Sequence, residues 1–496
     1  MNFSSTPARL RTILGLLLIA VLAVLVHGYH PGADDAAIYV PAIKRIADPA
    51  LYLFGAEYFM SHANLSICAF LVGNSARLSH LPIDLVVFLW HAACIFLLLS
   101  ASWQLLGACA TSLRARWCGV ALLAGLLSVP VAGTALAIMD PYFTARALAT
   151  PLTILAVACY MTNRPKQAVA WLVLTAAIHP QMSVFALVLL VCLTIARRLH
   201  LDGGTAPAGT GIALAGIPFL FEFQPARGVA REVLFSRTYF FVFQWEWYEW
   251  VGVFAPLVLL GCYAWFKPKG STPAAQCLAR TLVFFGAAFT VFAVILNSFA
   301  RLENYTRWQP MRCFQVLYVI FFLLLGAWVG EWLLQGKVWR WLALFVPLGA
   351  GMWMMQRDAF SASPHVEWPG MHSSNPWTTA FLWIRGHTPK DAVFALDPAY
   401  LSIHGEDRQG FRAVAERSAL ADNLKDSGAV SLFPRLADGW KAQQRAQAGW
   451  RTFGRVEYET LAKQYPVTWI LAPHPTPAGM VCPYDNGELV VCQVAH

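Results

Sequence analysis

Residues 9–39 read RLRTILGLLLIAVLAVLVHGYHPGADDAAIY. The apolar run from Leu10 to Val26 follows two arginines and is long enough to cross the hydrocarbon core of a bilayer as a helix. The residues after it, VHGYH, do not form the small-residue site at which a signal peptide is cleaved. We therefore expect a retained membrane anchor, after which the chain emerges with two adjacent carboxylates, Asp34 and Asp35.

Apolar runs of this kind recur along most of the chain. Of the 496 residues, 58% are hydrophobic and 13% are charged, whereas soluble domains carry about 25% charged residues. The runs predict a mostly α protein, a polytopic transmembrane helical bundle with about eleven spans. These spans lie near 10–26, 81–106, 117–139, 147–162, 167–180, 182–196, 209–223, 250–266, 277–299, 312–335 and 338–355.

The distribution of basic residues indicates the orientation of the bundle. With the N-terminus in the cytoplasm, every second loop is short and basic, as the positive-inside rule requires. These loops contain Arg114 and Arg116, Arg164 and Lys166, Arg197 and Arg198, Lys267 and Lys269, and Lys337 and Arg340. The net charge of +9 is thus spread over short clusters between spans, which does not indicate a nucleic-acid groove. The composition fits a bacterial inner membrane.

Residues 1–355 are expected to form the transmembrane domain, with a long first external loop at 28–80. After that point the composition becomes polar, and residues 356–496 predict a small soluble α/β domain. Strand-like runs lie at 392–396, 467–471 and 488–491, and helical stretches lie near 375–387, 409–422 and 455–464. An odd number of spans places this domain outside the cytoplasm, in the periplasm of a bacterium.

The cysteines agree with that side of the membrane. Cys482 and Cys492 flank the turn at Asn486-Gly487, and Asn-Gly between two strand-like runs predicts a hairpin. Two cysteines that face each other across a hairpin in an oxidising compartment predict a disulfide. The remaining nine lie in or near the spans or the first loop, where a buried apolar role is expected.

The adjacent carboxylates Asp34 and Asp35 are the first candidates for chemistry. Because neighbouring carboxylates repel each other, one of them needs a cation, a metal or a shared proton as a partner. The alternative is that one of them caps the helix that follows, and the two roles are compatible. Tyr39, a few residues further on, is a further candidate for the same site.

Two further polar positions emerge on the same face of the membrane. Asp140 ends the third span, and Arg146 follows it by six residues, so these two either pair with each other or belong to a site. His179 precedes a proline in another external turn, where it is either a plain turn residue or a site residue.

Arginines on the external side form the complementary half of this pattern. Arg301, Arg307 and Arg312 flank one short loop, where the positive-inside rule does not favour basic residues. Arginine binds phosphate in a bidentate manner and keeps its charge when partly desolvated. These side chains either bind an anionic substrate or extend to lipid phosphates without a specific ligand.

The chain resembles the GT-C superfamily of membrane glycosyltransferases, which includes protein O-mannosyltransferases, the aminoarabinose transferase and the catalytic subunit of oligosaccharyltransferase. The resemblance rests on the acidic pair Asp34-Asp35 at the start of a long first loop, on Asp140 at the end of the third span, and on the external C-terminal domain. It is closest to bacterial GT-C-like proteins whose C-terminal part contains a segment like WIRGHTPKDAVF at 383–394.

The resemblance implies an inverting transfer of a sugar from a polyprenyl-phosphate donor to an acceptor at the outer face of the membrane. Asp34 or Asp35 is then the general base. Asp140 matches the position that helps some members hold a divalent metal, Mg²⁺ or Mn²⁺, but it lacks their paired acid. The external arginines, namely Arg146, Arg301, Arg307 and Arg312, are then the donor phosphate ligands.

Two other classes of protein fit parts of the pattern. A transporter or flippase of a lipid-linked solute needs ionisable residues at mid-membrane depth, and the span interiors contain only His91 as a clear instance. A non-catalytic GT-C-like scaffold of the cell envelope would tolerate substitution of Asp34, Asp35 and Asp140 but not of the C-terminal domain.

Overall fold

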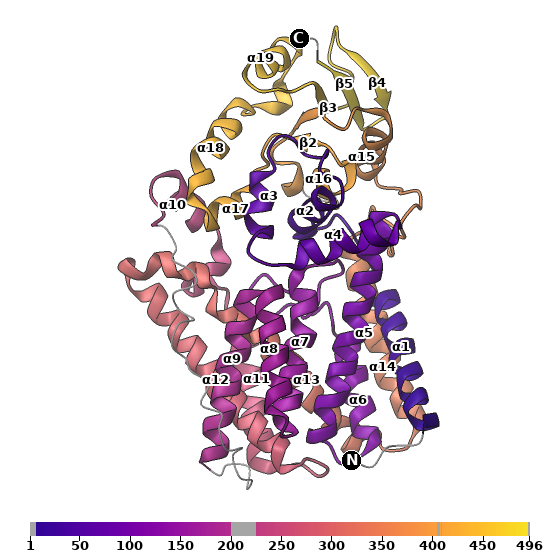
Figure 1. The fold of residues 1–496 in the computed structure, drawn as a ribbon, viewed down its shortest axis with the longest axis vertical. Coiled ribbons are helices and arrows are strands. Elements are labelled where there is room, and N and C mark those ends of the chain that lie inside the picture. The colour runs from indigo at the N-terminus through magenta and orange to yellow at the C-terminus, as the bar shows by residue number, and fades with distance from the viewer. Residues whose placement is uncertain (1–5, 200–224, 404–406, 408, 495–496) are drawn as a thin grey trace.

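The computed structural model describes residues 6–199, 225–403, 407 and 409–494. Over these residues the chain is mostly helical, with a lower bundle and a smaller upper part that contains a mixed sheet (Figure 1). The apolar run predicted at 209–223 lies outside the described residues.

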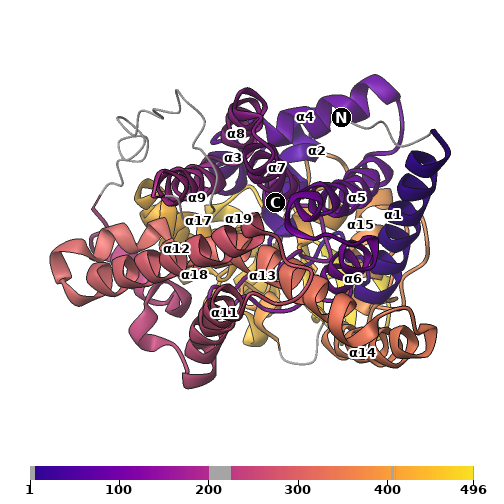
Figure 2. The same ribbon diagram turned by 90° about the horizontal axis from the view of Figure 1, so that it is seen from below.

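Seven helical segments of the described chain are long and apolar enough to cross a membrane, so the chain is a multi-pass integral membrane protein. They are α1 (Thr6–His27), α5 (Ile83–Cys109), α9 (Pro180–Arg198), α11 (Trp247–Phe266), α12 (Pro273–Ser298), the segment Ala300–Leu334 that contains α13 (Phe314–Val329), and α14 (Val338–Ala359). Two shorter apolar helices, α7 (Ala145–Met161) and α8 (Pro165–Ile178), stand among them. Seen along the bundle, α1 and α14 lie at one edge and α12 extends to the other (Figure 2).

The segment predicted as a span at 117–139 differs from the expectation. Helix α6 (Leu113–Ala124) ends at Gly125, and an irregular hairpin follows in which Val131 N donates to Leu136 O at 2.8 Å. Irregular backbone is tolerated at membrane depth only where protein surrounds it, and Val131 and Ile138 are fully buried. Glycine and proline in this stretch favour leaving the helix, and the buried hairpin carries the chain to Asp140.

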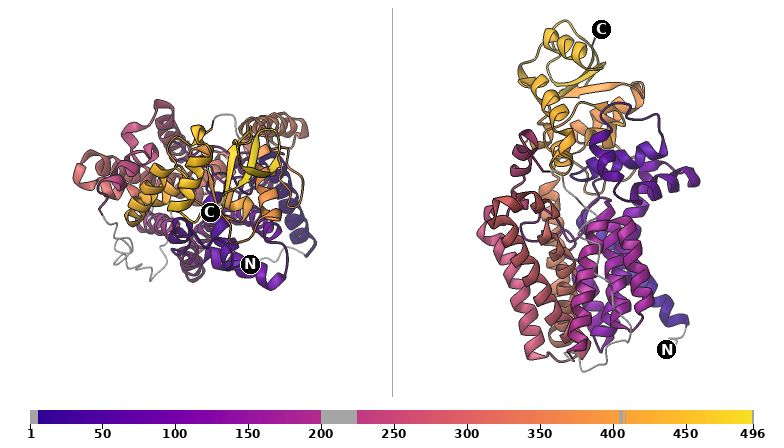
Figure 3. Two further views of the ribbon diagram at one scale, coloured as in Figure 1. Left: turned by 90° about the horizontal axis from the view of Figure 1, so that it is seen from above. Right: turned by 60° about the vertical axis from the view of Figure 1, so that its left-hand side comes forward.

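The segment expected as the first external loop forms three helices, and two of them, α2 and α3, pack against the C-terminal part of the chain (Figures 1 and 3). They are α2 (Ala36–Ala47), α3 (Glu57–Ala63) and α4 (Cys68–Ser79). Lys44 of α2 contacts Asp84 at the top of α5 at 2.7 Å and Glu416 of the C-terminal part at 2.8 Å. Arg385 contacts the same two carboxylates at 2.6 and 3.0 Å. Four charged side chains thus join the first loop, the bundle and the C-terminal part.

The C-terminal sheet has five strands in the order β2-β1-β3-β5-β4. Strand β1 (Val393–Leu396) is parallel to β2 (Ser418–Ala419) and β3 (Trp469–Pro473), whereas β5 (Leu489–Gln493) is antiparallel to β3 and β4 (Val481–Asp485). The mixed α/β character expected of this region is confirmed. A disulfide joins Cys482 of β4 to Cys492 of β5 across the turn at Asn486-Gly487.

Short helices surround this sheet and connect it to the bundle. They are α15 (Pro376–His387), α16 (Phe411–Ala415), α17 (Lys425–Leu432), α18 (Ala437–Ala446) and α19 (Arg455–Gln464), together with α10 (Val229–Phe235) from the membrane domain. Helix α17 packs against both α3 and α10, so it lies where the first loop, the bundle and the C-terminal part meet.

Candidate functional site

A cavity of about 750 Å³ lies between the top of the bundle and the C-terminal part. Its apolar wall comes from α9 and α12, with Phe185, Val188, Phe289 and Phe292 among the lining residues. Its polar wall is formed by α2, α3, α7, α17 and the turns around residues 237–240 and 307–312. The cavity therefore joins an apolar surface on two candidate membrane spans to a strongly charged end beside the C-terminal part.

The acidic pair of the first loop meets a lysine of the C-terminal part at this charged end. Lys425, the first residue of α17, contacts Asp35 Oδ1 through its Nζ at 3.2 Å and also binds Asp34 Oδ1. Asp35 lines the cavity with a side chain that is 29% exposed, whereas the Lys425 side chain is 13% exposed. The carboxylate pair thus has a cation as its partner.

Asp35 occupies the N-cap position of α2, but its side chain makes no capping hydrogen bond. The alternative that this acid serves only as a cap is therefore wrong for Asp35. Asp34 adopts φ 45°, a left-handed conformation that is uncommon for a residue with a side chain. Its Oδ2 accepts a hydrogen bond from Tyr142 Oη at 3.1 Å, so its carboxylate is held between Tyr142 and Lys425.

Nearby positive side chains keep the carboxyl group of Asp35 ionised. Burial by itself raises the pKa of this carboxyl, but the attraction of Lys425, Arg146 and Arg312 outweighs burial and holds the pKa well below its usual range. The carboxylate groups in turn hold the pKa of Lys425 above its ordinary value, although burial opposes this. At neutral pH the site therefore contains the ammonium group of Lys425 beside the ionised carboxylate of Asp35.

Asp140 and Arg146 form a buried ion pair, as one of the two alternatives for these residues predicted. Arg146 also lines the cavity, so the pair places a guanidinium in the wall close to Asp35. Asp140 itself is 7% exposed and does not belong to the lining.

Two of the three arginines around the external loop reach the cavity. Arg307 and Arg312 line it, and the Arg312 guanidinium lies 5.7 Å from the centre of the Tyr239 ring. Arg301 is exposed and does not line the cavity, so the structure does not bring it together with the other arginines. Arg146, Arg307 and Arg312 thus supply three guanidinium groups from two segments that are far apart in the sequence.

His179 and Tyr39 also line the cavity. His179 caps α9, its Nδ1 accepting from Met182 N at 3.4 Å, and burial together with nearby Arg146 lowers its pKa to about 3. It is therefore neutral at pH 7. The Tyr39 hydroxyl lies 3.0 Å from Nε2 of His62, a histidine of α3 that shares the cavity.

The acids of this site do not fit a divalent metal as they are arranged. Lys425 occupies one oxygen of each carboxylate of the pair, and Arg146 occupies Asp140. A hard cation such as Mg²⁺ requires several free oxygen ligands around one point. Among the residues that the structure describes, no three His, Cys, Asp or Glu side chains form such a group.

No family model and no curated protein sequence matches this chain. Among solved structures, the chain is similar to the crystal structure of the Archaeoglobus fulgidus oligosaccharyltransferase tethered through a disulfide to an acceptor peptide with an NVT sequon. The two are 11% identical, the alignment covers 92% of this chain and 68% of that one, and the TM-score is 0.45.

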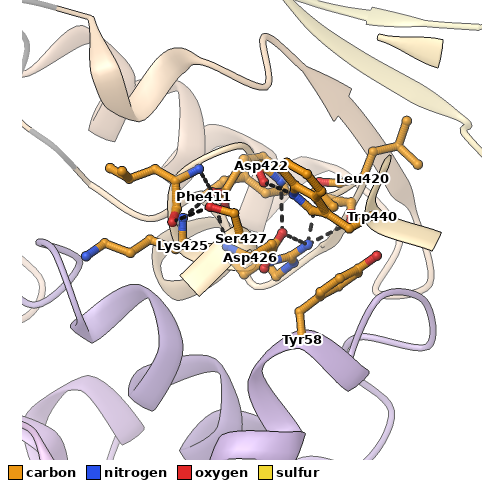
Figure 4. Close-up of polar contacts among 12 residues, drawn as sticks. Tyr58, Phe411, Leu420, Asp422, Lys425, Asp426, Ser427 and Trp440 are labelled. Carbon is orange, nitrogen blue, oxygen red and sulfur yellow. Dashed lines mark hydrogen bonds and ion pairs between the residues drawn. The ribbon is translucent and has the colours of Figure 1, made fainter. Parts of the chain in front are cut away.

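Several site residues were not predicted from the sequence, and Lys425 is the most important of them. A network beneath it orders the start of α17 (Figure 4): Asp422 Oδ1 accepts from Leu424 N at 2.8 Å, and Asp422 O accepts from Trp440 Nε1 at 2.8 Å. The Lys425 side chain extends away from this network. About 390 residues of sequence separate Lys425 from Asp34 and Asp35, so no local sequence motif predicts these contacts.

Proposed function

We propose that this chain is a membrane glycosyltransferase that transfers a sugar from a polyprenyl-phosphate donor to an acceptor at the outer face of the membrane. The observation that carries the proposal is the cavity, in which an ionised carboxylate, three guanidinium groups and an apolar wall lie together. Each of these features corresponds to one part of such a substrate: the acceptor hydroxyl, the phosphate and the lipid chain.

The arginines account for the phosphate. As the bond between the sugar C1 and the phosphate oxygen breaks, negative charge accumulates on the leaving polyprenyl phosphate. Arg146, Arg307 and Arg312 line the cavity and supply donors suited to phosphate oxygens. We assign them this role and leave Arg301 out, because it lies outside the cavity wall.

The apolar wall accounts for the lipid. Phe185 and Val188 belong to α9, and Phe289 and Phe292 belong to α12, and both helices are candidate membrane spans. A polyprenyl chain that lies along these helices stays at membrane depth while its phosphate reaches the arginines. Such a cavity is suited to an amphipathic donor rather than to a soluble nucleotide sugar.

Asp35 accounts for the acceptor. Its ionised carboxylate accepts the proton of the acceptor hydroxyl while the acceptor oxygen attacks C1 from the face opposite the phosphate, which inverts the configuration. The products are the glycosylated acceptor, polyprenyl phosphate and a proton that leaves through Asp35. Asp34 holds Lys425 and Tyr142 and assists from the second position of the pair.

The same proposal includes the topology. About eleven crossings, a cytoplasmic N-terminus and a C-terminal domain of residues 356–496 in the periplasm place the cavity at the outer membrane face. The disulfide between Cys482 and Cys492 is consistent with that compartment.

The test uses purified protein reconstituted in lipid with a panel of polyprenyl-phosphate sugars, and it follows the release of polyprenyl phosphate. Asp35→Asn is expected to lower turnover by at least about 100-fold, since a positioned general base contributes about 10²–10⁴-fold. Asp391→Asn is the matched control, because Asp391 is an exposed acid of the C-terminal part. It is expected to keep wild-type turnover.

Measuring the affinity for the donor distinguishes residues that bind the donor from the residue that acts as the general base. Arg312→Gln is expected to weaken binding of the donor, whereas Asp35→Asn is expected to leave it intact. If no donor in the panel is turned over and Asp34→Asn, Asp35→Asn and wild type bind the donors equally, the transferase proposal is wrong. The non-catalytic scaffold then becomes the better description.

A further inference from the structure

The roles proposed for the arginines, the apolar wall and Asp35 do not explain why Lys425 contacts the acidic pair. Lys425 belongs to the C-terminal part, yet its ammonium group lies against both carboxylates of the first external loop. Two adjacent carboxylates repel each other and need a cation beside them, and in this chain that cation is a side chain.

We propose that Lys425 is the counter-cation of the Asp34-Asp35 pair, supplying the positive charge that a divalent metal would supply and fixing Asp35 for the reaction. This inference rests on the proposed transferase activity. It makes Lys425 a positioning residue and the C-terminal domain an essential part of the catalytic site.

The hydrogen bonds of the pair support this role. Lys425 binds one oxygen of each carboxylate, and Tyr142 donates to Asp34 Oδ2. Within the described part of the chain, three of the four carboxylate oxygens therefore have a partner, and Oδ2 of Asp35 has none. Because Asp35 lines the cavity, this oxygen is the one available to accept the proton of an acceptor hydroxyl.

The start of α17 is held firmly enough to place an ammonium group. Asp426, the residue after Lys425, forms a two-pronged ion pair with Arg412, at 2.8 and 3.0 Å. Arg237 of the membrane domain donates to Leu424 O at 2.6 Å from the other side. The lysine backbone is thus fixed both within the C-terminal part and against the bundle.

The charges that face Asp35 come from every element around it. The positive charges are Lys425 of α17, Arg146 of α7 and Arg312 of the turn at 307–312, and the negative ones are the carboxylates of Asp34 and Asp140. The hydroxyl of Tyr39 and the imidazole of His62 lie beside them. Among the described residues, Lys425 is the one side chain that hydrogen bonds to the carboxylate of Asp35. Removing its charge is therefore expected to have the largest effect on the protonation of this carboxylate.

The first test measures the ion pair without any substrate. Acetylation of Lys425 in the full-length protein is followed by mass spectrometry across alkaline pH, with exposed Lys463 as the internal standard. In the isosteric double variant Asp34→Asn/Asp35→Asn the ammonium loses its partners, so we expect Lys425 to react at least about tenfold faster relative to Lys463 than in wild type. An unchanged ratio would overturn the proposed role.

The second test uses transfer activity and a chelator. Wild-type turnover is expected to be unaffected by EDTA, Lys425→Met to lose about 100-fold or more, and Lys425→Arg to recover part of that loss because it restores the charge. In Lys425→Met the acidic limb of the pH profile of kcat/KM is expected to move to higher pH. Lys463→Met is the matched control and is expected to behave as wild type.

Different results would overturn the role of Lys425 and the transferase activity. If EDTA abolishes wild-type turnover and Mg²⁺ restores it, or if Lys425→Met has the wild-type pH profile, the role of Lys425 is wrong while the transferase stands. If wild type turns over no donor and binds the donors no differently from Asp34→Asn and Asp35→Asn, the transferase itself is wrong. The acetylation ratio reports on the ion pair in either case.

Discussion

Replacing Asp426 with asparagine removes one partner of a buried ion pair that holds helix α17. Arg412 and Asp426 have side chains that are 8% and 5% exposed, and two hydrogen bonds of 2.8 and 3.0 Å join them. Removing one partner of such a pair leaves a buried charge uncompensated, at a cost of about 3–5 kcal/mol. Because asparagine still accepts one hydrogen bond, we expect Asp426→Asn to cost about 3 kcal/mol.

Hydrogen exchange measured by mass spectrometry is the suitable assay, because it reports opening of one element within a large membrane protein. A loss of about 3 kcal/mol corresponds to roughly 150-fold faster exchange of the amides of α17. Arg455→Met is the matched control, because Arg455 pairs with Glu459 on the surface of the same region. An exposed pair contributes less than about 1 kcal/mol, so exchange in α17 is expected to change less than about fivefold.

A double variant tests whether the uncompensated charge of Arg412 is the cause of the destabilisation. Arg412→Met/Asp426→Leu removes both charges, and replacing a whole buried pair by apolar side chains is often neutral or stabilising. We expect it to exchange more slowly than Asp426→Asn. If Asp426→Asn exchanges within about threefold of wild type, or if the double variant is the less protected one, the pair does not hold α17 in the way its geometry indicates.

Three further predictions concern other parts of the molecule, and each is checked by thermal unfolding of the purified protein in one detergent. Burial, together with nearby Asp407, raises the pKa of Glu367 from 4.5 to about 8. The stability linked to this group is therefore fully present below pH 4.5 and is lost as the pH rises through 8. The loss of unfolding free energy is at most about 5 kcal/mol. Glu367→Gln is expected to flatten that decline, and an equally steep decline in the variant would contradict the assignment. A Cβ on Gly326 would lie 2.7 Å from the Cα of a glycine in α6, so Gly326→Ala is expected to cost about 1–3 kcal/mol of stability. Gly351→Ala is the control and is expected to be neutral, because a Cβ there would meet no neighbouring atom within 4 Å. Equal effects of the two substitutions would refute the steric explanation. Cys482→Ser opens a loop of ten residues and is expected to cost about 2.5 kcal/mol, and a reducing agent is expected to lower the midpoint of wild type but not of this variant.

The sequence predicted the membrane-spanning helices well because their signal is local. A run of about 20 apolar residues satisfies its own backbone as a helix and matches the bilayer in length, whatever its neighbours are. Among the described residues the run at 117–139 is an exception, since only Leu113–Ala124 is helical and the hairpin after it is stabilised by the protein around it. The runs at 147–162 and 167–180 correspond to the two shorter apolar helices, α7 and α8. Hydrophobicity alone does not distinguish a span from a buried irregular segment.

In the C-terminal part, too, local sequence patterns predicted some elements and missed others. Its strands were expected at 392–396, 467–471 and 488–491, close to where β1, β3 and β5 lie, because short apolar runs between turn residues indicate strands. The helix expected at 409–422 is instead a short one at Phe411–Ala415, and α17 begins at Lys425. Helix α17 is short, contains Gly428 and lacks an amphipathic pattern, so its tertiary contacts order it.

By itself, the sequence determined that the chain spans a membrane many times, where along the chain its acids and arginines follow the spans, and that its C-terminal part combines helices with strands. All of these depend on the spacing of residues that are near one another in the chain. Only the tertiary structure decided that Lys425 meets Asp34 and Asp35, that Arg146, Arg307 and Arg312 share one cavity, and that Arg301 lies outside it. Residues so far apart are brought together by packing between helices, and a contact of that kind leaves no pattern in the local sequence.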